Sequence, residues 1–213
     1  MRGALFAAGA TAAALIAPTF GARASSTDLY VATLTGSQQT VVTRTGSIHD
    51  ELGCTYHVND ADREVLTFSA TRRVPLALRP GGTLPRLALA ARVTVTGSRH
   101  RQSELIDGDP SVCDAGQPPR TTRCARRVVR TRLVLRPSGG TRFALVGALT
   151  GHRTCATTLT TPDRFPLPSE SRLRVPQRPV AAVFAKARVR STTKSHGITE
   201  TTDLRWTLVL RHA

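Results

Sequence analysis

The stretch Arg86–Thr96, with the sequence RLALAARVTVT, alternates apolar and polar residues with a period of two. Its odd positions, from Leu87 to Val95, are all apolar, and its even positions include Arg92 and two threonines. Successive side chains of a β-strand point to opposite faces of the sheet. This stretch therefore predicts a strand with an apolar inner row and a basic, hydroxylated outer row.

Similar alternation recurs along the chain, and no stretch after residue 24 carries a convincing apolar period of 3.6 residues. Further strands are expected at residues 29–35, 39–45, 65–71, 74–78, 132–136, 142–149, 183–190 and 204–211. About eight strands separated by turns predict an all-β fold, an antiparallel β-sandwich or barrel.

Glycine and proline mark the expected connections between these strands. Hairpin turns are predicted at Pro80–Gly82, Pro137–Gly140 and Ser195–Gly197. The triplet Thr-Gly-Ser at 35–37, 45–47 and 96–98 is interpreted as shared turn chemistry. The proline-rich segment 162–179 is expected to be a long surface crossover, because proline is excluded from central strands.

The N-terminus has the features of a cleavable secretory signal peptide, predicted at residues 1–24. A short n-region containing Arg2 precedes an apolar stretch from Ala4 to Ala17, which is shorter than the roughly 20 residues that span a bilayer. Small residues at Ala22 and Ala24 provide a cleavage site. We expect a secreted protein, either free outside the cell or associated with the cell wall, whose residues 25–213 form one domain without a transmembrane segment.

The chain is strongly basic, with a net charge of +16 that falls to +14 if the leader with its two arginines is removed. Lys186 and Lys194 are the only lysines among the 30 basic residues, a bias that GC-rich codon usage produces. Part of the arginine excess is therefore compositional. The charge still attracts polyanions, whatever its origin.

Four cysteines follow the leader, and an even number in an exported chain predicts disulfides. We expect Cys113 to pair with Cys124 around a loop rich in proline and glycine. Cys54 would then pair with Cys155 by exclusion, tying two distant segments together.

The densest group of potential metal ligands or catalytic residues lies between residues 49 and 64. It comprises His49, Asp50, Glu51, Cys54, His57, Asp60, Asp62 and Glu64. Oxidation of Cys54 outside the cell would remove the best zinc ligand, and no second ligand pair follows at zinc-finger spacing. We interpret the group as an acidic surface loop, with a secreted hydrolase centred on it as the alternative.

Two shorter motifs have simple structural interpretations. Ser191–Lys194 fits S-x-x-K, the nucleophile motif of serine β-lactamases, but it lacks the companion S-D-N and K-T-G elements and falls in an expected turn. Asp107–Asp109 resembles the start of a calcium loop but lacks the spaced ligands and the bidentate glutamate of an EF-hand. We expect a hairpin loop and a turn, and no metal or cofactor.

Arginine clusters are the remaining functional signal. The densest cluster contains Arg123, Arg126, Arg127, Arg130 and Arg132. We expect this cluster to bind phosphates or carboxylates weakly. Aromatic residues make up 4% of the chain, which is few for a protein that stacks bases. Trp206 falls in an inner row, so we assign it to the core. Sequence-specific nucleic-acid binding is therefore not expected.

Three features besides the leader resemble those of uncharacterised secreted proteins of high-GC actinobacteria. They are the first strand YVATLTG at Tyr30–Gly36, two central cysteines flanking a turn-rich loop, and the closing strand LRWTLVL at Leu204–Leu210. The resemblance implies no activity and no site residues. The sequence itself favours a non-enzymatic, disulfide-stapled binding or structural domain held near anionic envelope polymers, with non-specific polyanion or nucleic-acid binding as a further alternative.

Overall fold

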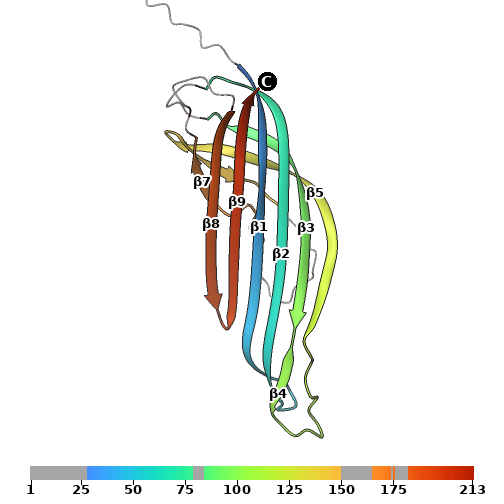
Figure 1. The fold of residues 1–213 in the computed structure, drawn as a ribbon. Coiled ribbons are helices and arrows are strands. Elements are labelled where there is room, and N and C mark those ends of the chain that lie inside the picture. Colours follow the sequence, from blue (N-terminus) through green and yellow to red (C-terminus); the bar gives the residue numbers. More distant parts are fainter. Residues whose placement is uncertain (1–27, 79–83, 150–164, 174, 176–181) are drawn as a thin grey trace, which may run out of the picture.

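The computed structural model describes residues 28–78, 84–149, 165–173, 175 and 182–213, and every regular element in them is a β-strand. The strands, shown in Figure 1, are β1 (Asp28–His49), β2 (Thr55–Leu76), β3 (Leu87–Arg101), β4 (Ser103–Asp107), β5 (Arg120–Gly139), β6 (Arg142–Val146), β7 (Ser169–Arg172), β8 (Ala182–Ser195) and β9 (Ile198–His212). The predicted all-β class is confirmed. The expected signal peptide and the Pro80–Gly82 turn lie outside the described residues.

The strands form one antiparallel sheet in the order β7-β6-β5-β3-β2-β1-β9-β8, with β4 paired to β2. The sheet curls until its two end strands meet, and the Ser171 hydroxyl of β7 donates a hydrogen bond of 2.7 Å to the Lys186 carbonyl of β8. The eight strands of this path therefore make a nearly closed barrel.

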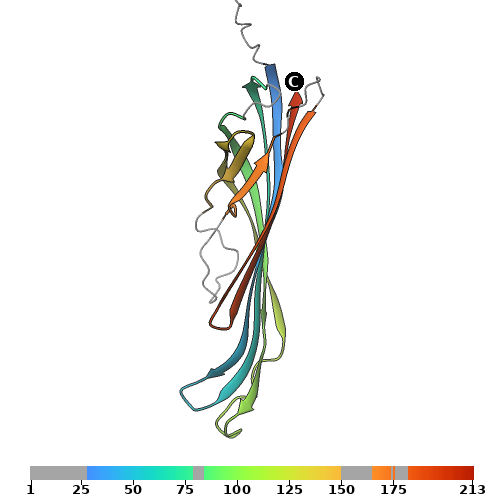
Figure 2. The ribbon, with the colours of Figure 1, turned by 90° about the vertical axis from the view of Figure 1, so that its left-hand side faces the viewer.

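The molecule is much longer than the barrel. β1 and β2 each contain 22 residues, and their pairing runs without interruption from Asp28↔Leu76 to His49↔Thr55. Figures 1 and 2 show these strands leaving the barrel as a curved ribbon that ends in the β1–β2 turn and β4. The barrel end also carries the C-terminus, and the opposite end is called the foot below.

Alternating side chains fill the barrel as the sequence pattern predicts. The odd residues of β3 from Leu87 to Val95 are buried, and they face the even residues of β9 from Leu204 to Leu210. Trp206 lies in this core, where its Nε1 donates a hydrogen bond of 2.9 Å to the Ser169 hydroxyl. The assignment of Trp206 to the core is confirmed.

The described part of the proline-rich segment is not a surface crossover, so that expectation is wrong. Phe165, Leu167 and Leu173 are buried in the core, and residues 169–172 form β7. The backbone N–H of Leu167 donates a hydrogen bond of 2.8 Å to the side-chain oxygen of Gln38 on β1. The two prolines in the described part of this segment, Pro166 and Pro168, precede β7, so the strand itself contains no proline. The remainder of the segment lies outside the described residues.

The three Thr-Gly-Ser triplets are also not turns, because each lies inside a strand. Gly36 is in the middle of β1 and pairs with both Phe68 and Trp206. A Cβ at Gly36 would lie 2.4 Å from the Phe68 ring and 2.6 Å from the Arg205 carbonyl oxygen. This glycine therefore provides room for a ring that packs against the strand, and the expected strands at 29–35 and 39–45 are one.

The inner face changes character where the ribbon leaves the barrel. Asp62, which is buried, forms ion pairs with Arg101 at 2.9 Å and with Arg99 at 3.5 Å. Thr40 and Thr202 meet through their hydroxyls at 3.2 Å. The side of the ribbon that continues the barrel interior is therefore held by polar contacts, with the buried side chains of Val42 and Val58 among them.

The disulfide pairing expected from the sequence is wrong. Cys54 is bonded to Cys113, with a Cα–Cα distance of 5.8 Å. The long strands carry the β1–β2 turn and the β4–β5 loop to the same end of the molecule, whereas Cys124 is placed on β5 opposite Gly97. This excludes Cys113–Cys124 and Cys54–Cys155. Cys124 is disulfide-bonded too, and Cys155 lies outside the described residues.

Candidate functional site

The strongest functional feature is the outer face of the sheet, made by the outward-pointing residues of β1, β2, β3, β5, β8 and β9. Strand periodicity places apolar residues inside and leaves the alternate positions to the solvent. Basic side chains are exposed on five of these strands: Arg63, Arg73, Arg92, Arg123, Arg130, Arg132, Arg136, Lys186, Arg188, Arg190, Lys194, Arg205 and Arg211.

Acidic side chains are almost excluded from this face. Among the outward positions of the six strands in the described part of the chain, Asp203 is the one acid. Asp60, Asp62, Glu64 and Glu200 occupy the other side of the ribbon, because they fall at even positions of β2 and β9. The fold therefore keeps acids off the outer face, whereas the other side carries both signs of charge, since Arg99 and Arg101 lie there beside Asp62.

Like charges face each other directly across this sheet. Arg92 of β3 pairs with Arg130 of β5, and Arg188 of β8 pairs with Arg205 of β9. Like charges at directly opposite positions destabilise a sheet. Asp203 compensates the second pair, since its carboxylate lies 3.2 Å from Arg188 and 3.8 Å from Arg205. No acid within the described residues forms an ion pair with Arg92 or Arg130.

A shallow depression of about 450 Å³ lies on the outer face where β1, β8 and β9 run together. Its lining combines the guanidinium of Arg190 with hydroxyls such as those of Ser37 and Thr201. Gln39 also lines it, and its side-chain oxygen accepts a hydrogen bond of 2.9 Å from Arg63. Arg205 and Asp203 line it as well, so the depression offers guanidinium groups and hydroxyls beside one carboxylate.

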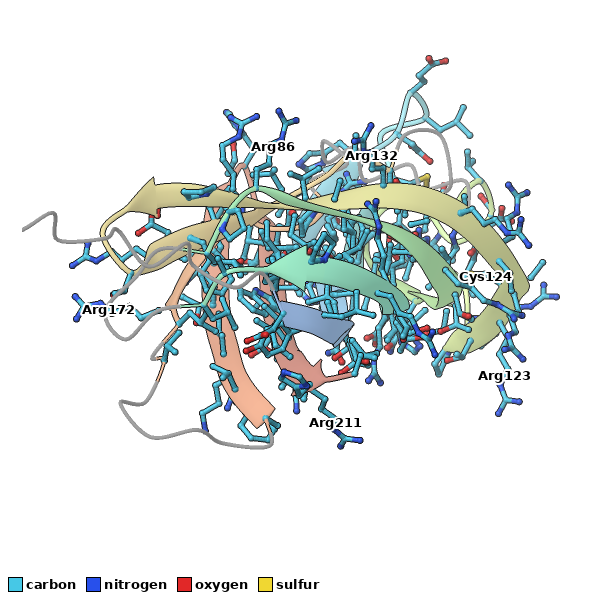
Figure 3. The ribbon with its side chains drawn as sticks, turned by 90° about the horizontal axis from the view of Figure 1, so that it is seen from above. Arg86, Arg123, Cys124, Arg132, Arg172 and Arg211 are labelled. Carbon is cyan, nitrogen blue, oxygen red and sulfur yellow. A yellow bond between two sulfur atoms is a disulfide. The ribbon has the colours of Figure 1, made fainter. Side chains whose placement is uncertain are left out.

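The five arginines expected to form a patch are not gathered on one side. Arg123, Arg130 and Arg132 lie on the outer face, whereas Arg127 pairs with inward-facing Val95. Arg126 lies at the irregularity between Val95 and Gly97, where the register with β5 shifts by one residue. In Figure 3 the labelled Arg123 and Arg132 point to different sides of the molecule.

The sequence cluster missed the basic residues that β8 and β9 contribute. Lys186, Arg188, Arg190 and Arg205 are far from the predicted cluster in sequence, and the β8–β9 hairpin places them on the same sheet. Their signal was the alternation of basic with apolar residues within each predicted strand, rather than local density of arginine.

The cluster between residues 49 and 64 does not converge on one site. Cys54 is in the disulfide, and the Asp50 carboxylate accepts hydrogen bonds from the backbone N–H groups of Leu52 and Cys54. His57 is exposed, and Asp60 and Asp62 pair with arginines. No group of three or more metal-binding side chains occurs among the described residues.

One hydroxyl–imidazole contact lies in that region. His49 Nδ1 is 2.8 Å from the Thr55 hydroxyl. Catalysis by such a pair needs a third group that orients the imidazole. Within the described residues no carboxylate is hydrogen-bonded to His49. This contact therefore closes the β1–β2 hairpin and does not by itself support the hydrolase alternative.

Ser191–Lys194 lies in β8, so the expectation of a hairpin loop is wrong, whereas Asp109 lies in a turn as expected. Ser191 and Lys194 are three residues apart on β8, so their side chains point to opposite faces and cannot act on one substrate atom. Asp109 caps a turn by accepting hydrogen bonds from the hydroxyl and the backbone N–H of Ser111. These bonds hold the pKa of the Asp109 carboxyl below its ordinary value, the hydroxyl contributing most.

Comparison with known proteins identifies no relative. No protein-family model, no curated protein and no solved structure matches this chain. In the part of the chain described here, no helix is long and apolar enough to cross a membrane. The resemblance to secreted actinobacterial proteins and the predicted leader remain sequence-based predictions.

Proposed function

We propose that this protein is a non-enzymatic, exported binding domain that holds an anionic polymer of the cell envelope against the outer face of its sheet. The observation that carries the proposal is the excess of positive charge on the outer face: basic side chains are exposed along five of its strands, and Asp203 is its one acid among the described outward positions. An uncompensated array of this kind attracts polyanions.

The direct pairing of Arg92 with Arg130 provides a specific place where an anionic group would bind. Two guanidinium groups opposite each other repel, and a bound phosphate or carboxylate between them would turn that repulsion into a pair of charge-assisted hydrogen bonds. The array follows strands rather than ending in a deep pocket, which suits an extended polymer better than a small molecule.

The proposal is tested by measuring the affinity for poly(glycerol phosphate) across a series of salt concentrations. We expect affinity to fall steeply with salt, because exposed charges are screened over about 10 Å at 0.1 M. Duplex DNA, measured in parallel, tests the nucleic-acid alternative and should show no sequence preference. Binding that does not respond to salt would contradict the mechanism.

A matched pair of variants locates the binding face. R92S/R130S removes two charges from the outer face, whereas R120S/R127S removes two exposed charges whose strand positions face the other side. By analogy with DNA, where each lost phosphate contact reduces the salt slope by roughly one, R92S/R130S should flatten the dependence more than R120S/R127S. Equal effects of both variants would show that net charge, and not this face, governs binding.

A further inference from the structure

The foot of the molecule exposes large apolar side chains. It consists of residues 50–54 and 103–119, the β1–β2 turn together with β4 and the loop that follows it. Leu52 is 68% exposed, and Ile106 and Val112 are each 55% exposed. The Cys54–Cys113 disulfide joins the two segments, two residues after Leu52 on one and directly after Val112 on the other. Exposed apolar groups gathered in this way mark an interaction site.

The same residues are acidic, although the chain as a whole is strongly basic. Residues 50–54 and 103–119 contain six acids and no lysine or arginine, in a protein with 30 basic and 14 acidic residues: the acids are Asp50, Glu51, Glu104, Asp107, Asp109 and Asp114. The foot is thus an apolar surface with an acidic rim.

The foot is held in one conformation. Asp50 and Asp109 each cap a turn, and the disulfide fixes the two turns relative to each other. Gly108 packs so closely against the disulfide that a Cβ there would lie 2.5 Å from the Cys113 sulfur. Ile106 falls where the pairing of β2 with β4 shifts between Thr55 and Tyr56, an irregularity of the kind that redirects side chains. A surface ordered in advance loses little entropy on binding.

A complementary surface lies near the barrel end of the outer face, and we call it the head patch. It comprises Leu29, Val31, Phe184 and Val209 with the basic residues Arg73, Lys186 and Arg211. Leu29 is 45% exposed and Phe184 is 61% exposed. Val31 pairs with both Arg73 and Arg211, and Val209 pairs with Phe184, so the strands bring these residues together. The nearby Asp28 lies 3.9 Å from His212.

We infer that the foot of one molecule docks on the head patch of a second copy of this chain. Each surface combines apolar area with one sign of charge, and the signs are opposite. Because Figures 1 and 2 place the foot and the barrel end at opposite ends of the molecule, the contact is head-to-tail. A heterologous contact of this kind leaves a free foot and a free head patch on every complex, so it adds further copies into a chain unless it closes into a ring.

The contact is small, because three side chains at a tip meet one aromatic ring and its neighbours. It therefore belongs with weak, transient interfaces. The inference goes beyond the proposed function and does not depend on it, since no polymer takes part. The proposed function could fail while this contact exists, and the reverse also holds.

The test is sedimentation velocity of the full exported chain over a range of protein and salt concentrations, without polymer. We expect the weight-average sedimentation coefficient to rise with protein concentration at low salt and to fall as salt is added. L52S/I106S/V112S should weaken association by about tenfold or more, as loss of that apolar contact implies. V128S removes an exposed apolar residue outside both surfaces and should leave association unchanged.

Mixing two deficient variants separates this arrangement from a symmetric one. The foot variant L52S/I106S/V112S keeps its head patch, and the head variant F184S/K186S/R211S keeps its foot. Each alone should be monomeric, and the mixture should form one-to-one complexes that grow no further. A mixture that stays monomeric would overturn the inference, as would a monomeric wild type at all concentrations.

Two other ligands of the foot, calcium and a lipid surface, are tested with the same variants. Association that requires calcium and is abolished by a chelator would assign the acids to a metal instead. Binding to phosphatidylcholine vesicles that is lost in the foot variant would assign the apolar tip to lipid. Either result would overturn the head-to-tail contact.

Discussion

Gly36 shows how a single residue sets the course of a strand. In the sequence it stands between threonine and serine and has the chemistry of a turn, yet β1 passes straight through it. The reason lies on the neighbouring strands, where the Phe68 ring and the Arg205 carbonyl oxygen both approach the space that a side chain would fill. The residue types of one segment can resemble those of a turn, but they do not predict that an aromatic ring on another strand packs against it.

Replacing Gly36 with alanine should therefore destabilise the protein. The ring of Phe68 can move, but the Arg205 carbonyl is backbone and cannot move without disturbing β9. Overpacking of this kind costs about 1–3 kcal/mol. Urea unfolding measures the loss, with S37A on the outer face of the same strand as the control, for which a change within about 0.5 kcal/mol is expected. Equal midpoints for G36A and S37A would contradict the packing explanation.

At the scale of the element, the β8–β9 hairpin was predictable because all of its information is local. Ser195–Gly197 was expected to be a turn, and His196 and Gly197 have φ values of 47° and 74°. Two positive φ values in succession are typical of a type I′ turn, whose twist matches that of the flanking strands. Gly197 takes this conformation freely, whereas His196 does so at a cost.

The variant H196N should stabilise this hairpin, because asparagine is favoured at the first central position of a type I′ turn. The gain is partly offset by loss of the 2.8 Å contact between the Ser195 hydroxyl and His196 Nδ1. We expect a net rise in melting temperature of about 1–3 °C, from the relation between free energy and melting temperature for a chain of this length. S195A removes the contact without changing the backbone preference. A melting temperature of H196N below that of S195A would contradict the prediction.

Strand patterns were predictable, and the contacts between distant segments were not. Alternation identified the inner rows of β3 and β9 correctly, because the period of two belongs to each strand separately. The Cys54–Cys113 pairing depends on two turns reaching the same end of long strands, so nearness in sequence favoured the wrong partner. Likewise, Arg188 and Arg92 share a face only because β1, β2 and β9 lie between their strands.

At the scale of the whole molecule, the structure divides into parts of different composition. The barrel has an apolar interior, the outer face carries uncompensated positive charge, and the foot carries apolar and acidic groups. A polymer bound along the outer face of several copies joined foot to head would be held at many points at once, and multivalent contacts raise affinity without new chemistry. The two surfaces share Arg73, Lys186 and Arg211, so a docked foot would leave the rest of the outer face, including Arg92 and Arg130, for the polymer.

The ribbon should open more readily than the barrel. Strands such as β1 and β2 run through both, but the apolar core ends near Gln38, and below it the inner face is held by polar contacts such as Thr40–Thr202 and Arg101–Asp62. Regions with few buried apolar contacts exchange their amide hydrogens through local opening, at a lower free energy than global unfolding. We expect the amides of Leu34 and Val93 to exchange only on global unfolding, and those of Val58 and His100 to exchange faster.

The variant C54S/C113S tests the same difference in stability between ribbon and barrel by loosening the foot. The disulfide joins the two loops of the foot across 59 residues of sequence, so its loss should release the ribbon first. Hydrogen exchange followed by mass spectrometry should then accelerate at Val58 and His100 by more than at Leu34 and Val93. The variant S47A, on an exposed outward position of β1 near the foot, should leave both sets unchanged. Equal acceleration in both sets would show that ribbon and barrel unfold as one unit, and that polar contacts hold the long strands as firmly as the apolar core does.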